Sequence, residues 1–193
     1  MCPFRSEPGN RLSGRGIGSS PAVALKAMHA DRPIRILIVD DDRVDRGLYK
    51  QCLQQSPVWK FECAEADSAI AGMEMANAWP PDCALLDFNL PDMDGIEFLS
   101  RLKSGPNGLP WAIVMLTAYG CEELAVRAMK AGASDYLPKG RLSAGILAQT
   151  VVNAVERFRM QQQIEQQRLA LSSDLAADSW QSSTFAICPS SIR

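Results

Sequence analysis

Several polar residues in this chain each stand just after a short apolar run, and their types suit chemistry on a charged phosphoryl group. The polar residues are Asp40, Asp41, Asp87, Thr117 and Lys139, and the runs before them are Ile34–Val39, Cys83–Leu86, Ala112–Leu116 and Tyr136–Leu137. Short apolar runs of this kind are typical of buried strands in a parallel sheet. The carboxyl ends of such strands line one crevice, where ligands bind. We therefore expect three carboxylates, a hydroxyl and an ammonium to meet in one pocket.

Asp87 is the candidate nucleophile of this pocket. It ends the third predicted strand, at the centre of the sheet, and a carboxylate can attack a phosphoryl group to form an acyl phosphate. Asp40 and Asp41 follow the neighbouring strand and are candidate ligands of Mg²⁺, which takes oxygen ligands and contacts phosphate while keeping waters. Lys139 would offer a point charge to a phosphate oxygen, and Thr117 a hydroxyl donor. Catalysis at such a site is mostly positioning and charge neutralisation.

The elements that position these residues alternate between strands and helices. Asp42 suits a helix N-cap, with Asp45 three positions later as its capping-box partner. The apolar face of that helix is expected to comprise Val44, Leu48, Cys52 and Leu53. The later strands are expected at Val58–Cys63, Cys83–Asp87, Trp111–Leu116 and Ser134–Leu137, and the later helices at Ser68–Ala78, Ile96–Lys103, Glu122–Ala131 and from Leu142 onward. This alternation predicts an α/β fold with a doubly wound, five-stranded parallel sheet.

The composition indicates one globular domain with additional tails. The chain has 193 residues, 47% of them hydrophobic, which is enough for one core of ordinary size. A net charge of −2 without a basic stripe argues against a nucleic-acid partner. No apolar run approaches the roughly 18 residues that a membrane span needs. Six scattered cysteines favour a reduced, cytoplasmic setting, and the single histidine, His29, lies outside the predicted core.

The chain is expected to divide into four segments. Residues 1–33 are rich in Gly, Pro and Ser and predict a disordered leader, and residues 34–158 carry the folded domain. Residues 159–172 form a polar, Gln-rich helical extension, which we interpret either as a solvated helix or as a coiled coil. Residues 173–193 are predicted to be a disordered tail. A homodimer through residues 142–171 is a further hypothesis.

The ordered set of motifs strongly resembles the receiver domain of bacterial two-component response regulators. The motifs are Val39–Asp41, Leu86–Pro91 followed by Met93 and Gly95, Leu116–Ala118 and Tyr136–Lys139. The resemblance covers about residues 34–158 and includes the order and spacing of every element. It implies a flavodoxin-like receiver fold, here with an extended C-terminal helix. It also implies a signalling module that is not an enzyme beyond its own phosphorylation and dephosphorylation, with a histidine kinase or histidine phosphotransfer protein as partner.

The resemblance also implies a role for individual residues at the strand ends. Asp87 would be the phosphoacceptor. The side chains of Asp40, Asp41 and Asp87 would surround Mg²⁺ together with the backbone carbonyl of Asn89.

The same resemblance implies a conformational switch. Thr117 would move toward the phosphoryl group and Tyr136 would turn inward behind it, which would alter the face formed by the last two helices and the last strand. One position departs from the family pattern, because Gly140 follows Lys139 where a proline is usual.

Two other classes of function remain open. The chain could be the regulatory front end of a larger enzyme, such as a histidine kinase or a diguanylate cyclase, because a long last helix often leads into such domains. A Mg²⁺-dependent aspartyl phosphohydrolase is the other alternative, since Asp40–Asp42 matches the Asp-x-Asp spacing of those enzymes formally. The contexts of Asp87 and Lys139 fit a receiver better.

Overall fold

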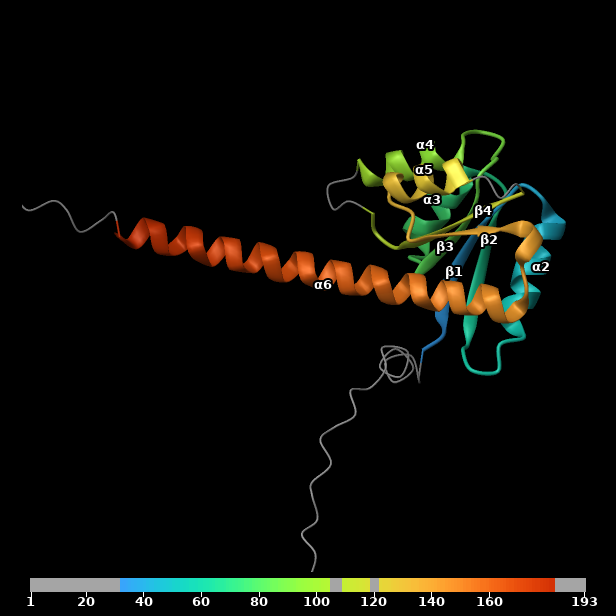
Figure 1. Ribbon diagram of the computed structural model, residues 1–193, viewed down its shortest axis with the longest axis horizontal. Helices are drawn as coiled ribbons and strands as arrows, with labels where there is room; N and C mark the ends of the chain where they lie inside the picture. Colours follow the sequence, from blue (N-terminus) through green and yellow to red (C-terminus); the bar gives the residue numbers. More distant parts are fainter. Residues whose placement is uncertain (1–31, 105–108, 119–121, 183–193) are drawn as a thin grey trace, which may run out of the picture.

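The computed structural model describes residues 32–104, 109–118 and 122–182, and these form a five-stranded sheet covered by helices on both faces (Figure 1). All neighbouring strands are parallel, in the order β2-β1-β3-β4-β5. The strands are β1 (Ile34–Val39), β2 (Phe61–Ala66), β3 (Cys83–Asp87), β4 (Ala112–Thr117) and β5 (Asp135–Pro138). The helices are α2 (Arg43–Gln54), α3 (Ala69–Ala78), α4 (Gly95–Lys103), α5 (Glu122–Ala131) and α6 (Ala144–Ser182), with a 3-10 turn η1 (Lys139–Arg141) before α6. The predicted doubly wound α/β fold is confirmed.

Two hydrophobic cores hold the helices against the sheet. On one face α2 and α6 pack over the central strands, burying Tyr49, Leu53 and Val151. On the other face α3, α4 and α5 form a second core around Phe98. Figure 1 shows α3, α4 and α5 grouped on one side of the sheet and α2 and α6 on the other. Every residue of β3 and β4 is buried because both sheet faces are covered, which explains why these strands lack apolar–polar alternation.

The strand β2 begins later than predicted. The sequence predicted Val58–Cys63, but the ladder with β1 starts by pairing Ile34 with Phe61. Val58 is 53% exposed and lies in the turn before the strand, where the Trp59 amide donates to the Ser56 hydroxyl at 3.2 Å. The position of β2 is therefore set by its register on β1 and not by where its apolar residues begin.

The buried face of α2 also differs from the predicted one. Leu53 is fully buried as predicted, but Val44 and Leu48 are 77% and 44% exposed, and Tyr49, which was not predicted, is fully buried. The N-cap prediction is confirmed, because the Asp42 carboxylate accepts from the Val44 amide at 2.7 Å. That cap fixes where the helix starts, and the helical spacing then turns residues 45, 49 and 53 toward the sheet.

The helix α6 is longer than predicted and runs well past the sheet (Figure 1). Its first turns bury Leu147, Val151 and Val155, whereas Ile164 and Leu169 farther along are exposed. The helix ends at Ser182, so residues 173–182 are helical where the sequence predicted disorder. The predicted leader, apart from residues 32–33, and the last eleven residues of the predicted tail lie outside the described residues.

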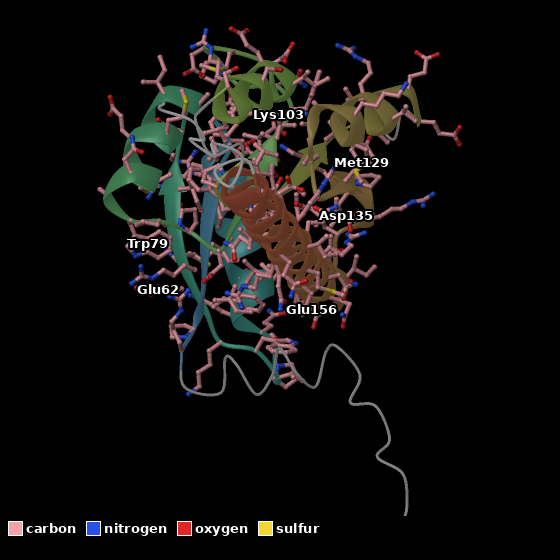
Figure 2. All side chains as sticks on the ribbon, turned by 90° about the vertical axis from the view of Figure 1, so that its left-hand side faces the viewer. Glu62, Trp79, Lys103, Met129, Asp135 and Glu156 are labelled. Carbon is pink, nitrogen blue, oxygen red and sulfur yellow. The ribbon has the colours of Figure 1, made fainter. Side chains whose placement is uncertain are left out.

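Ion pairs join α6 to the amino end of the sheet. Arg157 pairs with Asp135 of β5, and Figure 2, which views the molecule from the C-terminal end of α6, shows Asp135 beside the helix. Arg159 donates to Asp82 at 2.8 Å, just before β3. Asp82 also accepts from the Arg32 guanidinium at 2.7 Å and from the Arg35 amide at 3.0 Å. Among the described residues, no helix combines the length and apolar character that crossing a membrane requires.

Candidate functional site

The three predicted carboxylates meet at the carboxyl end of the sheet. β1 and β3 are neighbours with Val39 beside Leu86, so Asp40 and Asp87 leave the sheet side by side. Asp40, Asp41 and Asp87 each offer a carboxylate oxygen within 4.8 Å of the others. Asp40 and Asp87 are buried, whereas Asp41 is exposed. The pocket thus has a buried floor and one carboxylate on its solvent side.

Lys139 lies at the centre of this acidic group. Its ammonium nitrogen is 2.7 Å from Asp87 Oδ1 and 2.8 Å from Asp40 Oδ2. A third carboxylate, Asp45 of α2, also approaches the same nitrogen at 2.8 Å. From the sequence, Asp45 was expected only to complete a capping box, and its contact with Lys139 was not predicted. Its place in the first turn of α2 could have suggested it, because helical side chains tilt toward the N-terminus of the helix, which here follows the acidic strand end.

Fixed donors hold the two buried carboxylates. Asp40 Oδ1 accepts from the Asp42 amide at 2.9 Å, and Asp40 Oδ2 accepts from the Tyr49 hydroxyl at 3.3 Å. Asp87 Oδ2 accepts from the Asn89 amide at 2.8 Å, which leaves Oδ1 toward Lys139. Tyr49 was not predicted as part of the site, because it was not among the residues assigned to the buried face of this helix.

The electrostatics of the pocket favour an added cation. Burial raises the pKa of Asp87 above its ordinary value, and the charge of Asp40 raises it further, although Lys139 opposes both. Burial alone would lower the pKa of Lys139, but its three carboxylate partners hold it above the ordinary value, so the ammonium stays charged. Burial likewise raises the pKa of Tyr49, so its hydroxyl remains a donor at neutral pH. The single ammonium of Lys139 thus lies among four carboxylates, those of Asp40, Asp41, Asp45 and Asp87.

Thr117 and Tyr136 lie on adjacent strands beside the acidic group. Thr117 ends β4, is buried, and pairs in register with Pro138, directly before Lys139. Tyr136 pairs with Met115, two residues before Thr117, so both side chains belong to the same face of the sheet. Tyr136 is half-buried and lines an open groove of about 530 Å³ between α5 and η1. Such a groove leaves room beside the ring.

The loop after β3 is held close to the pocket by contacts that the sequence did not reveal. The Gly95 amide donates to the Phe88 carbonyl at 2.8 Å, which folds the loop back onto the strand end. A side-chain Cβ at Gly95 would lie 3.2 Å from the Asp87 carbonyl oxygen, so only glycine fits without displacement. The Asp92 carboxylate accepts from the Ala69 and Ile70 amides at 3.0 and 2.8 Å, which ties the loop to α3.

Gly140 lies in the 3-10 turn η1 directly after Lys139. A Cβ built at Gly140 would meet nothing within 4 Å, so the turn has space for a larger residue there. With glycine in place of the usual proline, Lys139 is still in contact with Asp87 and Asp40.

The residues at the strand ends fit a magnesium ion. Mg²⁺ prefers oxygen ligands and usually binds through one or two carboxylates, waters and phosphate oxygens. The pocket supplies two buried carboxylates and one exposed carboxylate, all of whose closest oxygens lie within 4.8 Å. Burial and the charge of Asp40 raise the pKa of Asp87, and a divalent cation bound beside these carboxylates would oppose both effects.

Comparison with known proteins gives a consistent result. The sequence matches the response regulator receiver domain family over residues 36–150, more than half of the chain. The phosphate regulon transcriptional regulatory protein PhoB of Escherichia coli is 34% identical over 139 residues, which cover 71% of this chain and 59% of PhoB. The chemotaxis protein CheY of Halobacterium salinarum is 36% identical over 106 residues, which cover 54% of this chain and 83% of that CheY. The chain thus spans less than two thirds of the length of PhoB.

Solved structures share the fold. A putative response regulator from Chloroflexus aurantiacus superposes with a TM-score of 0.59 and 29% identity, covering 64% of this chain and 98% of that protein. A CheY-like receiver domain protein from Methanospirillum hungatei superposes with a TM-score of 0.56 and 29% identity, covering 67% and 98%. The predicted flavodoxin-like fold is therefore confirmed, with α6 as an extended last helix.

Proposed function

The chain belongs to the response regulator receiver family, and on that premise we propose that it is a phosphorylation-dependent signalling module whose phosphoacceptor is Asp87. The observation that carries this proposal is the direct contact of Asp87 Oδ1 with Lys139 at 2.7 Å inside a group of three carboxylates. Asp87 also ends the central strand and is buried at the carboxyl end of the sheet. No other described carboxylate combines these features.

In the proposed reaction a carboxylate oxygen of Asp87 attacks phosphorus. The new bond is an acyl phosphate P–O bond, and the bond from phosphorus to the donor breaks, so the electron pair leaves with the donor. The donor is the phosphohistidine of a histidine kinase or of a histidine phosphotransfer protein. Lys139 neutralises charge on a phosphoryl oxygen, and Thr117 offers its hydroxyl to another.

Mg²⁺ is the proposed cofactor. Asp40, Asp41 and Asp87 would hold it with the Asn89 carbonyl, and the bound ion supplies positive charge that offsets the phosphoryl oxygens. The chain's own contribution is to fix these ligands. The Tyr49 hydroxyl and the Asp42 amide orient Asp40, and the Asn89 amide orients Asp87.

The proposed output is a shift between two conformations. Thr117 would follow the phosphoryl group, and Tyr136 would turn into the space that this movement opens. Support comes from their placement on one sheet face and from the open groove beside Tyr136. The signal would reach a partner or a second copy through residues 142–171. We retain residues 34–158 as the receiver and residues 159–172 as an extension within α6.

A second proposal concerns what the receiver controls. The chain spans 59% of the transcriptional regulatory protein PhoB and 33% of a protein-glutamate methylesterase of Anaeromyxobacter dehalogenans. The family match covers the receiver domain alone, so the output of those proteins is not transferred here. The long helix α6 is compatible with a regulatory front end of a larger signalling protein, and we keep that as the alternative.

The test is phosphorylation by a small donor. We expect acetyl phosphate with Mg²⁺ to add the mass of one phosphoryl group, and Asp87→Asn to abolish the adduct. A simultaneous shift in elution volume would assign a dimerisation role to α6, whereas an adduct at unchanged volume would favour a monomeric switch. An unmodified protein under conditions where Mg²⁺ binding is measured directly would overturn the phosphoacceptor proposal.

A further inference from the structure

Lys139 is held by a carboxylate that is not at a strand end. Asp45 lies in the first turn of α2, and its Oδ2 is 2.8 Å from Lys139 Nζ. The side chain of Asp45 is 30% exposed and that of Lys139 is 20% exposed, so their contact is partly shielded from water. The contact joins a helix on one face of the sheet to the turn after β5, across 94 residues of sequence.

A local role does not explain Asp45. In a capping box the third residue of the helix would accept from the N-cap amide, but the Asp42 amide already donates to Asp40 Oδ1 at 2.9 Å. The Asp42 side chain itself caps the helix through the Val44 amide. An acidic residue in the first turn also interacts favourably with the helix dipole, yet that effect requires no contact with Lys139.

The hydrogen-bond donors of Lys139 match its partners in number. An ammonium has three N–H donors and no acceptor. Asp40, Asp45 and Asp87 each place a carboxylate oxygen at 2.7 or 2.8 Å from its nitrogen. Two of these partners, Asp40 and Asp45, would keep their contacts when Asp87 becomes an acyl phosphate.

We propose that Asp45 is a positioning residue for phosphorylation, which anchors one donor of Lys139 to α2 so that another donor stays directed at Asp87. The proposal rests on the proposed function of Asp87. With Asp40 and Asp45 holding two donors, the remaining donor can pass from Asp87 Oδ1 to a phosphoryl oxygen by a small rotation. Without Asp45, only Asp40 would anchor Lys139 apart from Asp87. The side chain would then be less restricted, and the additional rotamer freedom lost during the reaction would raise the barrier.

This role predicts a specific kinetic effect. Asp45→Ala should lower the maximal rate of phosphorylation by acetyl phosphate by about five- to tenfold, the order expected for one partly exposed charged hydrogen bond. The acetyl phosphate concentration at half-maximal rate should change by less than about twofold, because Asp45 does not contact the donor's binding position. Asp45→Asn keeps an acceptor oxygen without the charge, so its rate should fall between those of the alanine variant and the unaltered chain.

Asp42→Asn is the matched control. It removes one negative charge from the same acidic segment, and asparagine is as good an N-cap as aspartate, so the start of α2 is preserved. A general effect of charge on Mg²⁺ or on the anionic donor would appear equally in Asp42→Asn and in the Asp45 variants. An effect through Lys139 would appear only in the Asp45 variants.

A second measurement observes the anchoring without any phosphorylation. In protein labelled with ¹⁵N-lysine, the Lys139 ammonium should give a signal protected from exchange with water in the unaltered chain and in Asp42→Asn. That signal should broaden or vanish in Asp45→Ala. Circular dichroism of each variant establishes that α2 is intact.

The outcomes separate the inference from the proposed function. If the unaltered chain takes no phosphoryl group, the proposed function fails, and the ammonium signal alone decides whether Asp45 anchors Lys139. If the unaltered chain is phosphorylated and Asp45→Ala matches Asp42→Asn in both rate and ammonium signal, the positioning role is overturned. A rate loss that disappears at saturating acetyl phosphate would also overturn it, because the effect would then lie in donor binding.

Discussion

Replacing Asp87 with Asn should make the metal-free protein more stable, although it removes the proposed phosphoacceptor. Asp87 has a carboxylate oxygen within 4.8 Å of oxygens of both Asp40 and Asp41. At an effective dielectric constant near 20, each such pair of charges repels by at least about 3.5 kcal/mol. The contact with Lys139 at 2.7 Å is attractive by about 6 kcal/mol at the same dielectric constant. The attraction to Lys139 and the repulsion from Asp40 and Asp41 nearly cancel. The cost of burying the Asp87 charge therefore decides whether the variant is more or less stable than the unaltered chain.

We therefore expect Asp87→Asn to raise the free energy of unfolding by about 1–2 kcal/mol at pH 7 without Mg²⁺. Asparagine keeps the size of the side chain and an oxygen that can accept from Lys139. The pKa of Asp87 is raised in the folded state, so its ionisation costs stability as the pH rises through that raised pKa. The advantage of the variant should accordingly vanish below about pH 4, the ordinary range of an aspartate, where Asp87 is protonated in both states.

Mg²⁺ should reverse the order of stability. A ligand at 100 times its dissociation constant stabilises the folded state by about 2.7 kcal/mol, and the variant should gain less because it lacks one proposed ligand. Urea unfolding at pH 7, with a chelator and then with saturating Mg²⁺, measures both effects. A variant less stable than the unaltered chain in the chelator, or equally stabilised by Mg²⁺, would refute the reasoning. Asp42→Asn serves as the control for removal of a charge outside the pocket.

Two further predictions concern the support of the pocket and of α6. Asp82→Asn should cost about 2 kcal/mol at pH 7, because this carboxylate, with only 11% of its side chain exposed, accepts from two guanidinium groups and an amide. Burial raises the pKa of Asp82, but these donors lower it more, so its stabilisation is present above about pH 4 and is lost as the pH falls through the depressed pKa. Urea unfolding from pH 7 to pH 2.5 should show the two proteins converging in acid, and a constant difference would contradict the assignment. Gly95→Ala should cost about 1–3 kcal/mol and weaken Mg²⁺ binding, because its Cβ would lie 3.2 Å from the Asp87 carbonyl oxygen. Gly140→Ala, where a Cβ meets nothing within 4 Å, should change stability by less than about 0.5 kcal/mol, and equal effects of the two alanines would show that crowding at Gly95 is not the cause.

Much of the fold could be predicted because two patterns agreed: the apolar runs of the buried strands and the polar residues that follow them. The strands in the middle of the sheet are buried on both faces, so their apolar runs mark them clearly, and polar residues at the ends of these runs mark the pocket. The topology then brings Asp40, Asp87 and Lys139 together without any information beyond strand order.

The errors lie where burial is partial. β2 is an edge strand with half-buried residues, so its start depends on pairing with β1 and not on composition. On α2, Tyr49 is buried and Leu48 is exposed, because packing against the sheet decides which face of the helix is buried, and the apolar pattern alone did not show this. The contact of Asp45 with Lys139 was missed because it joins α2 to the turn after β5, and only the packed fold brings these two segments together. Asp92 was missed because its partners are backbone amides, whose position no side-chain pattern reveals.

Chemical mapping of the phosphoryl group identifies the residue that accepts it. Sodium borohydride reduces an acyl phosphate on aspartate to homoserine, which peptide mass spectrometry locates to a single position. After treatment with acetyl phosphate and Mg²⁺, the account predicts homoserine at position 87 alone, and none when Mg²⁺ is chelated. Homoserine at position 41 or 45 in place of 87, or a phosphoryl adduct that survives Asp87→Asn in full, would contradict it.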